Sequence, residues 1–413
     1  MSLLTIPKFL RNNPLLCIVV LLSPYLIVKS IYGGEFNTYL EAARQLRAGI
    51  DCYNIWLNHD NGTATQYGYS PLFATLLIPF TFLPSWVPCL LFLLADVVML
   101  FRVFRLIGGW LQPKEFSKKN LWLCLVLAFS LRFILHNFEM VQLNIFLLWL
   151  SLEGSQQIFF EKKILLGTFL ISLGINFKIL PLVFVPYLLY RKEFKSVGFL
   201  CGWSLLFLIL PASVFGFDFN NQLHSDWLNI INPLNEKYGV GQNIESFRIH
   251  GLSALFAAYF SKYNNDTFQW LFVSLSDQVV QLLTNLSRLV FITLTFYFLR
   301  TKPFSSFQSS RHFAFEVSYL LLITPLIFPQ QNKWAFVYIL PALGVAFYSL
   351  VQKREKFFSI KVGLLLAVFT LTTLTTDGII GKQLNYYTEC LKLVTIGTIL
   401  IVPILMLSRP EET

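Results

Sequence analysis

Long apolar stretches alternate with polar segments along most of this chain. A transmembrane helix needs about 20 mostly apolar residues, and candidate spans run from Pro14 to Tyr32, Trp86 to Ile107, Leu121 to Leu135, Leu143 to Phe160, Ser196 to Gly216, Gln278 to Leu299, Phe313 to Phe328, Ala335 to Val351, Val362 to Thr376 and Leu391 to Leu407. Two further pieces fit less well, because Pro71 to Pro84 is short and Ile164 to Tyr190 is interrupted. The pattern predicts an all-α polytopic membrane protein with about ten to twelve transmembrane helices.

The first apolar stretch follows a short basic start that contains Lys8 and Arg11. No small-residue cleavage site comes after it, so we expect an uncleaved first span rather than a signal peptide. Of the 413 residues, 55% are hydrophobic and only 13% are charged, which agrees with a membrane protein.

The net charge of +10 is concentrated in alternate connections between the spans. Basic residues gather at Lys8 and Arg11, at Arg102, Arg105, Lys114, Lys118 and Lys119, at Lys162 and Lys163, at Arg191, Lys192 and Lys195, at Arg300, Lys302 and Arg311, and at Lys353, Arg354, Lys356 and Lys361. The positive-inside rule places these connections in the cytoplasm. The charge is therefore a topology signal, and we expect no nucleic-acid partner.

The other set of connections is longer and more acidic and should face the periplasm or the lumen. These connections are Gly33 to Ser70, His136 to Gln142, Phe217 to Asp277, Pro329 to Lys333, and Asp377 to Cys390. We expect one integral membrane domain over residues 1–413, with a first external loop at 33–70 and a long external loop at 217–277. Most unusual polar residues fall on this external side, where we expect the function.

The first external loop begins "GGEFNTYLEAARQLRAG". Apolar residues recur at helical spacing from Phe36 to Leu46, and Gly49 stands in a stop position, which predicts an amphipathic helix along the outer membrane surface. Glu35 comes immediately before this helix. A carboxylate there is either a capping or dipole-favoured group or a functional one.

A lysine interrupts the apolar stretch from Ile164 to Tyr190 at "GINFK". The stretch has basic residues at both ends, so we expect a helical hairpin or two short helices with Gly174, Asn176, Lys178 and Pro181 at the turn. An intramembrane lysine indicates a functional site. The structural alternative is that Lys178 pairs with a carboxylate such as Glu153 or Asp96.

Metal, cofactor and disulfide signals are weak. His224 and His250 have no ligand-like spacing, and no glycine-rich phosphate loop or internal repeat is recognisable, so we expect no metal and no cofactor. Cys52 and Cys390 both fall in external connections, and a disulfide between them is one alternative to two free thiols.

The order of several short motifs resembles glycosyltransferase family 87, membrane mannosyltransferases with the GT-C fold. An acidic residue, a tyrosine, a glycine, a second tyrosine and a Tyr-x-Pro element occur in the family's order at Glu35, Tyr39, Gly49, Tyr53, Tyr69 and Pro71. "VQLNIFLLWL" and "GINFKILPLVFVPYLLYRKEFK" are similar to later family segments, and so is "GQNIESFRIHG", through Asn243 and Ser246. In "TPLIFPQQNKWAFVYILPAL", Gln330 and Gln331 stand where many members have histidine, and Glu35 stands where the family usually has aspartate.

The resemblance implies a GT-C-type bundle that transfers a hexose, mannose in the family, from a polyprenyl phosphate sugar to a lipid or glycan acceptor, with inversion. The reaction needs a base for the acceptor hydroxyl, and Glu35 is the candidate. Groups for the donor phosphate are Lys178, Arg248 and Lys333. Candidate substrate contacts are Tyr39, Tyr69, Gln142, Asn144, Asn243 and Gln330, although interhelical hydrogen bonding explains Gln142 and Asn144 equally well. The expected location is the bacterial inner (plasma) membrane, with the site facing the periplasm or exterior.

Two other functions share parts of this pattern. A transporter or lipid flippase would show inverted repeats and interrupted helices in corresponding halves, whereas only one interrupted segment is evident here. A polymerase or ligase of surface polysaccharide uses the same lipid phosphate chemistry.

Overall fold

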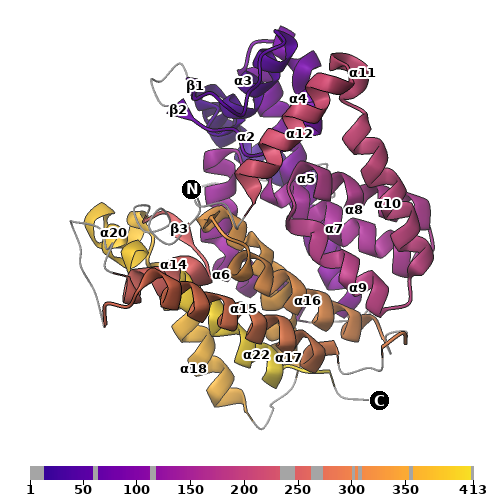
Figure 1. The fold of residues 1–413 in the computed structure, drawn as a ribbon. Helices are drawn as coiled ribbons and strands as arrows, with labels where there is room; N and C mark the ends of the chain where they lie inside the picture. The colour runs from indigo at the N-terminus through magenta and orange to yellow at the C-terminus, as the bar shows by residue number, and fades with distance from the viewer. Residues whose placement is uncertain are drawn as a thin grey trace, which may run out of the picture. The chain divides into compact units, whose positions relative to one another are not determined.

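A computed structural model of the chain describes residues 14–58, 64–111, 118–232, 247–261, 273–299, 303–305, 309–352 and 357–410. Within these ranges the protein is almost entirely helical (Figure 1). The only strands there are four of two residues each, which form two separate antiparallel pairs. The prediction of an all-α polytopic membrane protein is therefore confirmed.

The chain divides into two compact units, each built from three separate stretches. The first unit takes Met1–Arg105, Asn137–Pro181 and Phe199–Ile230, and the second takes Leu106–His136, Leu182–Gly198 and Ile231–Thr413. Neither unit is a continuous piece of sequence. The expectation of a single domain over residues 1–413 stays a prediction.

The first unit contains the N-terminal helices and the first external loop. Its elements are α2 (Pro14–Tyr32), α3 (Phe36–Arg47), β1 (Leu57–Asn58), β2 (Ala64–Thr65), α4 (Pro71–Leu77), the 3₁₀ helix η1 (Ile78–Phe82), most of α5 (Trp86–Leu111), the end of α6 (Lys119–Met140), α7 (Asn144–Phe159), α8 (Ile164–Phe177), most of α10 (Phe194–Ile209), α11 (Ala212–Phe215) and α12 (Phe217–Ile231). Helix α3 packs its apolar side against α4 and η1, so this side is buried inside the protein.

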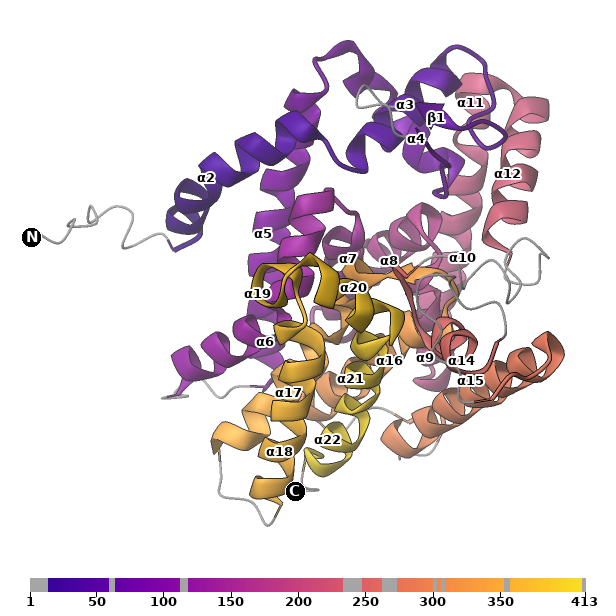
Figure 2. The same cartoon turned by 90° about the vertical axis from the view of Figure 1, so that its left-hand side faces the viewer.

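The second unit contains most of α6 and the C-terminal half of the chain. Its other elements are η2 (Leu180–Val183, which begins in the first unit), α9 (Phe184–Tyr190), β3 (Ile249–His250), α14 (Leu252–Phe260), α15 (Asp277–Leu299), α16 (Ser310–Ile327), β4 (Gln331–Asn332), η4 (Lys333–Ile339), α17 (Leu340–Gln352), α18 (Phe358–Phe369), the π-helical turn η5 (Thr370–Leu374), α19 (Asp377–Ile380), α20 (Lys382–Cys390), α21 (Leu393–Ile399) and α22 (Ile401–Leu407). Helix α22 packs against both α17 and α18 (Figure 2).

Membrane-spanning length is reached by fewer helices than the apolar stretches suggested. Among the described residues, five helices are long and apolar enough to cross a membrane, or up to seven if two bent pairs each count as one span. Other apolar stretches form shorter helices, such as Ile164–Phe177 and Phe358–Leu374. Proline, glycine and polar residues divide stretches that hydropathy alone reads as continuous, so fewer helices reach spanning length. The count of ten to twelve spans stays a prediction.

The second unit also holds a buried ion pair. The Arg191 guanidinium donates a hydrogen bond to the Glu316 carboxylate, and the Tyr187 hydroxyl donates a second one at 2.8 Å. The three side chains are buried, and they join α9 and its end to α16. Arg191, which the sequence marked only as a topology signal, therefore also has a packing role.

Cys52 and Cys390 are free thiols, so the disulfide between them does not form.

Two glycines allow α7 and α8 to pack closely. A Cβ atom on Gly167 would lie 2.6 Å from the carbonyl oxygen of Gly154, and a Cβ on Gly154 would lie 2.8 Å from the carbonyl oxygen of Gly167. Backbone atoms inside a helix cannot move aside easily. This contact therefore needs glycine on both helices.

We expect Gly167→Ala to destabilise the protein by about 1 to 3 kcal/mol, the usual cost of overpacking, and to lower its unfolding temperature in detergent. The matched control is Gly202→Ala on α10, where an added Cβ meets no atom within 4 Å. Equal unfolding temperatures for the two variants would contradict the close helix contact.

Candidate active site

Two glycines place Glu35 between α2 and α3. Gly33 and Gly34 adopt φ angles of +71° and +49°, a region that glycine enters without strain. The turn directs the Glu35 amide to the carbonyl oxygen of Met140, at 2.9 Å. A Cβ on Gly34 would lie only 2.7 Å from the same oxygen. The "GGE" sequence thus positions Glu35 against the end of α6.

The Glu35 side chain does not cap the helix that it precedes. Glu35 occupies the N-cap position of α3, yet its carboxylate makes no capping hydrogen bond to the helix backbone. The capping interpretation of this residue is therefore wrong, while the interpretation as a group favoured by the helix dipole stays a prediction. The side chain is partly exposed, as a base that must reach a substrate has to be.

Three of the predicted substrate contacts form one hydrogen-bonded chain. The Tyr39 hydroxyl donates to the Tyr69 hydroxyl at 2.9 Å, and the Tyr69 hydroxyl donates to the Gln142 amide oxygen at 3.3 Å. The Tyr53 hydroxyl supports this arrangement by donating to the backbone carbonyl of Tyr69 at 2.7 Å. Tyr39, Tyr69 and Gln142 are far apart in sequence, and the fold brings them together.

Burial keeps Tyr69 protonated. It raises the pKa of the Tyr69 phenol, the hydrogen bond from Tyr39 opposes this shift, and the negative charge of Glu35 adds to it. At neutral pH the phenol therefore remains a hydrogen-bond donor.

Lys178 ends α8 and joins the same group of side chains. The helix stops at Phe177, and Lys178 is extended, with φ −153° and ψ 131°; Pro181, three residues on, could not continue a regular helix. The Lys178 ammonium lies 5.4 Å from the centre of the Tyr69 ring, a cation–π distance. It is also within electrostatic range of Glu35. The predicted break at Lys178 is confirmed, while Gly174 and Asn176 lie inside α8.

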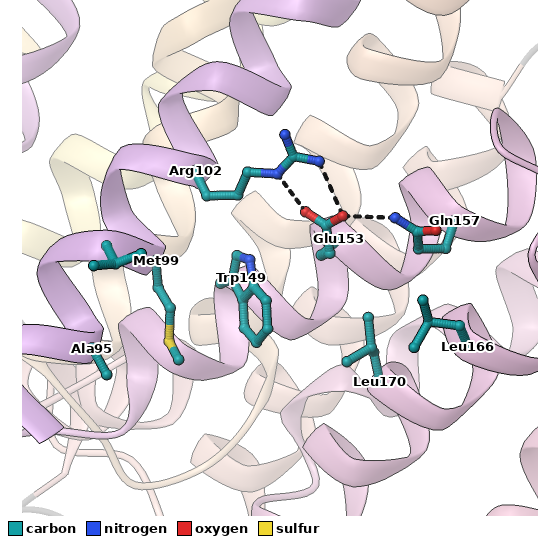
Figure 3. Close-up of a pocket in the computed structure, with 9 residues that line it drawn as sticks. Ala95, Met99, Arg102, Trp149, Glu153, Gln157, Leu166 and Leu170 are labelled. Atoms are coloured by element: carbon teal, nitrogen blue, oxygen red, sulfur yellow. Dashed lines mark hydrogen bonds and ion pairs between the residues drawn. The ribbon is translucent and has the colours of Figure 1, made fainter. Parts of the chain in front are cut away.

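Neither of the two carboxylates suggested as partners of Lys178 pairs with it. Glu153 accepts hydrogen bonds from Arg102 at 2.7 and 3.1 Å and from Gln157 at 2.8 Å (Figure 3). Asp96 is buried, and neither of its oxygens has a hydrogen-bond partner among the described residues. Lys178 forms no ion pair within the described part of the chain. The structural interpretation of Lys178 as a partner of Glu153 or Asp96 is therefore wrong.

A cavity of about 610 Å³ lies beside the Arg102 and Glu153 ion pair (Figure 3). It is lined mostly by apolar side chains of α5, α7 and α8, among them Met99, Trp149 and Leu170. None of the predicted site residues lines it.

Asn144 has a structural contact that the sequence left open. It begins α7 and is buried, and its amide nitrogen donates to the Asn137 side chain at 3.4 Å. The Gln142 backbone N–H donates to the Asn137 backbone carbonyl at 2.9 Å, so Asn137 anchors both residues. The interhelical hydrogen bond is present for Asn144, whereas Gln142 contacts Tyr69.

The remaining predicted residues belong to the second unit or lie outside the described residues. Arg248 is exposed, and its guanidinium lies 5.4 Å from the Phe247 ring centre. Gln330 is exposed with φ +55°. Lys333 forms an ion pair with Glu389. Asn243, with its motif partner Ser246, lies outside the described residues.

The sequence analysis did not name Arg132, Glu389 or Lys392 of the second unit, and it set His250 aside. Arg132 contacts Glu389 at 3.4 Å, Lys392 is buried, and His250 is fully buried. A charge inside an apolar stretch, as at Arg132 and Lys392, was the signal that could have identified two of them. Glu389 and His250 carry no such signal. No group of three or more potential metal ligands exists among the described residues.

Helices of membrane-spanning length, together with the family match that follows, define a class: this is a membrane glycosyltransferase. The model of glycosyltransferase family 87 matches residues 67–329, more than half of the chain. The chain therefore belongs to glycosyltransferase family 87. Glu35 and Tyr39 precede the matched residues, and Gln330 and Lys333 follow them.

One similar curated protein is GPI mannosyltransferase 1 of Candida albicans. The two sequences are 27% identical over 143 residues, which are 33% of this chain and 34% of that protein. The match thus spans about a third of the length of the relative. No solved structure matches this chain.

Proposed function

We propose that this protein transfers a hexose, specifically mannose, from a polyprenyl phosphate sugar to a hydroxyl of a lipid or glycan acceptor, on a GT-C-type scaffold. The observation that carries the proposal is the grouping of Glu35, Tyr69 and Lys178 in the first unit. A carboxylate and an ammonium beside tyrosine hydroxyls supply a base, a charge for phosphate and hydrogen bonds for a sugar. Family membership supports the transfer, and the name of the Candida relative supports mannose.

The proposed reaction is a single displacement. The Glu35 carboxylate accepts the proton of the acceptor hydroxyl while the oxygen of that hydroxyl forms a bond to the anomeric carbon. The bond from that carbon to the phosphate oxygen breaks on the opposite face, and the lipid phosphate leaves with the bonding electrons. The anomeric configuration therefore inverts. Lys178 stabilises the negative charge on the phosphate, and Tyr39, Tyr69 and Gln142 orient the sugar.

The function is tested with purified protein in lipid vesicles that contain a polyprenyl phosphate mannose labelled in the sugar. We expect a new glycosidic bond on a lipid or glycan acceptor, with inverted configuration, detected by mass spectrometry and NMR. Movement of the label across the bilayer without a new bond would instead indicate a transporter. Stepwise growth of one long glycan, or transfer of a whole chain, would indicate a polymerase or ligase.

The distribution of basic residues predicts that the site faces the periplasm or exterior of a bacterial plasma membrane. A reporter fused after Ile107 should report the cytoplasm, and one fused after Phe217 should report the outside. Reversed signals from this pair would contradict an external site.

Gly34→Ala should lower the transfer rate by displacing Glu35. An added Cβ would lie 2.7 Å from the Met140 carbonyl, which receives the Glu35 amide. Misplacing a catalytic group by about 1 Å can cost roughly 10²-fold, and we expect a loss of that order. The matched control is Gly49→Ala, which has a similar positive φ of +73° but no atom within 4 Å. Equal losses in the two variants would show that backbone strain, and not the position of Glu35, is responsible.

A further inference from the structure

Three helices of the first unit each contribute one face to the cavity beside the Arg102 and Glu153 ion pair. Its lining residues recur at helical spacing, as do Met99 and Arg102 on α5, Trp149 and Glu153 on α7, and Leu166 and Leu170 on α8. Residues three or four positions apart lie on the same side of a helix. Every lining residue belongs to the first unit, so the cavity forms within one compact part of the chain.

The cavity is apolar over most of its surface and is large enough for a ligand. Its volume of about 610 Å³ lies within the usual range of about 300 to 1,000 Å³ for ligand pockets. Val98 and Leu166 line it and are exposed at the surface of the protein. Helix α5 is long and apolar enough to cross a membrane, so lipid chains surround its exposed apolar side chains. A lipid chain is therefore the apolar ligand that reaches this cavity.

The Arg102 guanidinium lies at one edge of the cavity and has unused hydrogen-bond donors. It points toward Glu153, to which its Nε atom and one terminal nitrogen donate at 2.7 and 3.1 Å (Figure 3). A guanidinium has five N–H donors. Those that face away from Glu153 have no hydrogen-bond partner within the described part of the chain. The Arg102 side chain is 36% exposed, so a ligand can reach these donors.

Glu153 fixes the direction of the unused donors. Its carboxylate is buried, it accepts from Arg102 through both oxygens, and the Gln157 amide donates to one of these oxygens at 2.8 Å. Such a bidentate pair sets the plane of the guanidinium. The remaining N–H groups of Arg102 are therefore oriented before a ligand arrives, and the oxygens of a phosphate group match their geometry.

The charges around the cavity favour an anion. The guanidinium and carboxylate pair is neutral as a whole. The turn between α7 and α8 reaches the cavity, because the Lys163 backbone N–H donates to the backbone carbonyl of the lining residue Gln157 at 2.8 Å. This turn carries Lys162 and Lys163 against Glu161. Cations therefore outnumber carboxylates here, and a negatively charged phosphate group balances the excess.

We propose that this cavity binds one acyl chain of an anionic phospholipid, and that the phosphate of this lipid accepts hydrogen bonds from Arg102. The acyl chain covers the apolar side chains of the three helices. The positive-inside rule predicts that the nearby basic residues face the cytoplasm, and anionic lipids of the cytoplasmic leaflet attract basic segments. None of the residues proposed for sugar transfer lines the cavity, so the two proposals can fail separately.

The test measures lipid binding by the full chain in detergent. The probes are farnesyl phosphate and three lipids with the same acyl chains: phosphatidylglycerol, phosphatidylcholine and diacylglycerol. We expect phosphatidylglycerol to bind at least about tenfold more tightly than diacylglycerol, because hydrogen bonds to a charged group commonly contribute that much. It should also bind more tightly than the zwitterionic phosphatidylcholine. Equal affinity of phosphatidylglycerol and either of these lipids would overturn the proposal, and tighter binding of farnesyl phosphate would assign the cavity to a prenyl lipid instead.

Arg102→Gln tests the phosphate contact. It should weaken phosphatidylglycerol binding about tenfold and leave diacylglycerol binding unchanged, because only the phospholipid has a phosphate. The matched control is Arg105→Gln, one turn further along α5. Arg105 adds positive charge to the same region, but it is exposed, its guanidinium lies 6.0 Å from the Phe101 ring centre, and it does not line the cavity. The control should change the affinity by at most about twofold. Equal losses in the two variants would indicate a general attraction and would overturn the contact.

Leu170→Trp tests the apolar part of the cavity without changing a charge. The larger side chain occupies the space of the acyl chain and should weaken phosphatidylglycerol binding at least about tenfold. The control is Leu165→Trp on the same helix, because Leu165 is exposed and does not line the cavity. Unchanged phosphatidylglycerol binding in Leu170→Trp would overturn the proposal. This variant also decides the outcome if Arg102→Gln does not fold, since that substitution leaves Glu153 without its ion-pair partner.

Discussion

Glu35→Gln should reduce the turnover of sugar transfer by about 10² to 10⁴, the usual contribution of general-base catalysis. Glutamine keeps the size and the hydrogen-bonding capacity of the side chain but cannot accept the proton of the acceptor hydroxyl. Glu35→Asp should retain partial activity, because it keeps the carboxylate and shortens its reach by one methylene. The measurement is the initial rate with a labelled polyprenyl phosphate mannose in vesicles.

The matched control is Glu41→Gln, on the same helix as the site. Glu41 accepts hydrogen bonds from Arg44 and Gln45, so it has structural partners but no proposed part in the reaction. The Glu41→Gln protein should transfer sugar at nearly the original rate. The Glu35→Gln protein must also express and bind the donor normally, since a folding defect would otherwise explain its loss. A near-normal rate in Glu35→Gln would place the base elsewhere, and Asp51, Asp60 and Glu245 in the external loops would be tested next.

Lys178→Ala should weaken binding of the polyprenyl phosphate donor by about 10-fold to 100-fold, because a hydrogen bond to a charged group contributes roughly 1.5 to 3 kcal/mol. The residue has no ion-pair partner among the described residues, so its charge is available to a ligand. Lys178→Arg should restore part of the affinity, since it keeps the charge but changes the donor geometry. The measurement is the donor dissociation constant in detergent.

Lys163→Ala is the control at the other end of the same helical segment. Lys163 pairs with Glu161 at 2.8 Å and is largely exposed, so its loss should leave donor affinity unchanged. Exposed pairs of this kind contribute little to stability. Unchanged donor affinity in Lys178→Ala would show that Lys178 does not bind the donor. The extended backbone of Lys178 at the end of α8 would then have a structural role only.

The sequence by itself determined the helices and many of their boundaries. The predicted spans from Pro14 to Tyr32 and Trp86 to Ile107 correspond to α2 and α5, and the amphipathic segment after Glu35 is α3. Helix formation and burial depend on the spacing of apolar residues and on nearby glycine and proline, which are local properties. The break at Lys178 was predictable for the same reason.

Only the tertiary structure decided which polar side chains meet. The sequence named Tyr39, Tyr69 and Gln142 separately, and the fold joined them in one hydrogen-bonded chain. The fold also pairs Glu153 with Arg102, and not with Lys178. A charged side chain takes whichever partner the packing of distant helices brings within about 4 Å, and no local pattern contains that information.

Polar residues of the second unit show the same limit more sharply. Arg132 and Glu389 are separated by 257 positions in the sequence, and the pairing of β3 with β4 places His250 opposite Gln331. In the sequence, His250 was a histidine without ligand-like spacing. Its burial, the lack of a hydrogen-bond partner for its nitrogens among the described residues, and the cations around it are properties of the folded chain, because they depend on contacts between segments that are remote from one another.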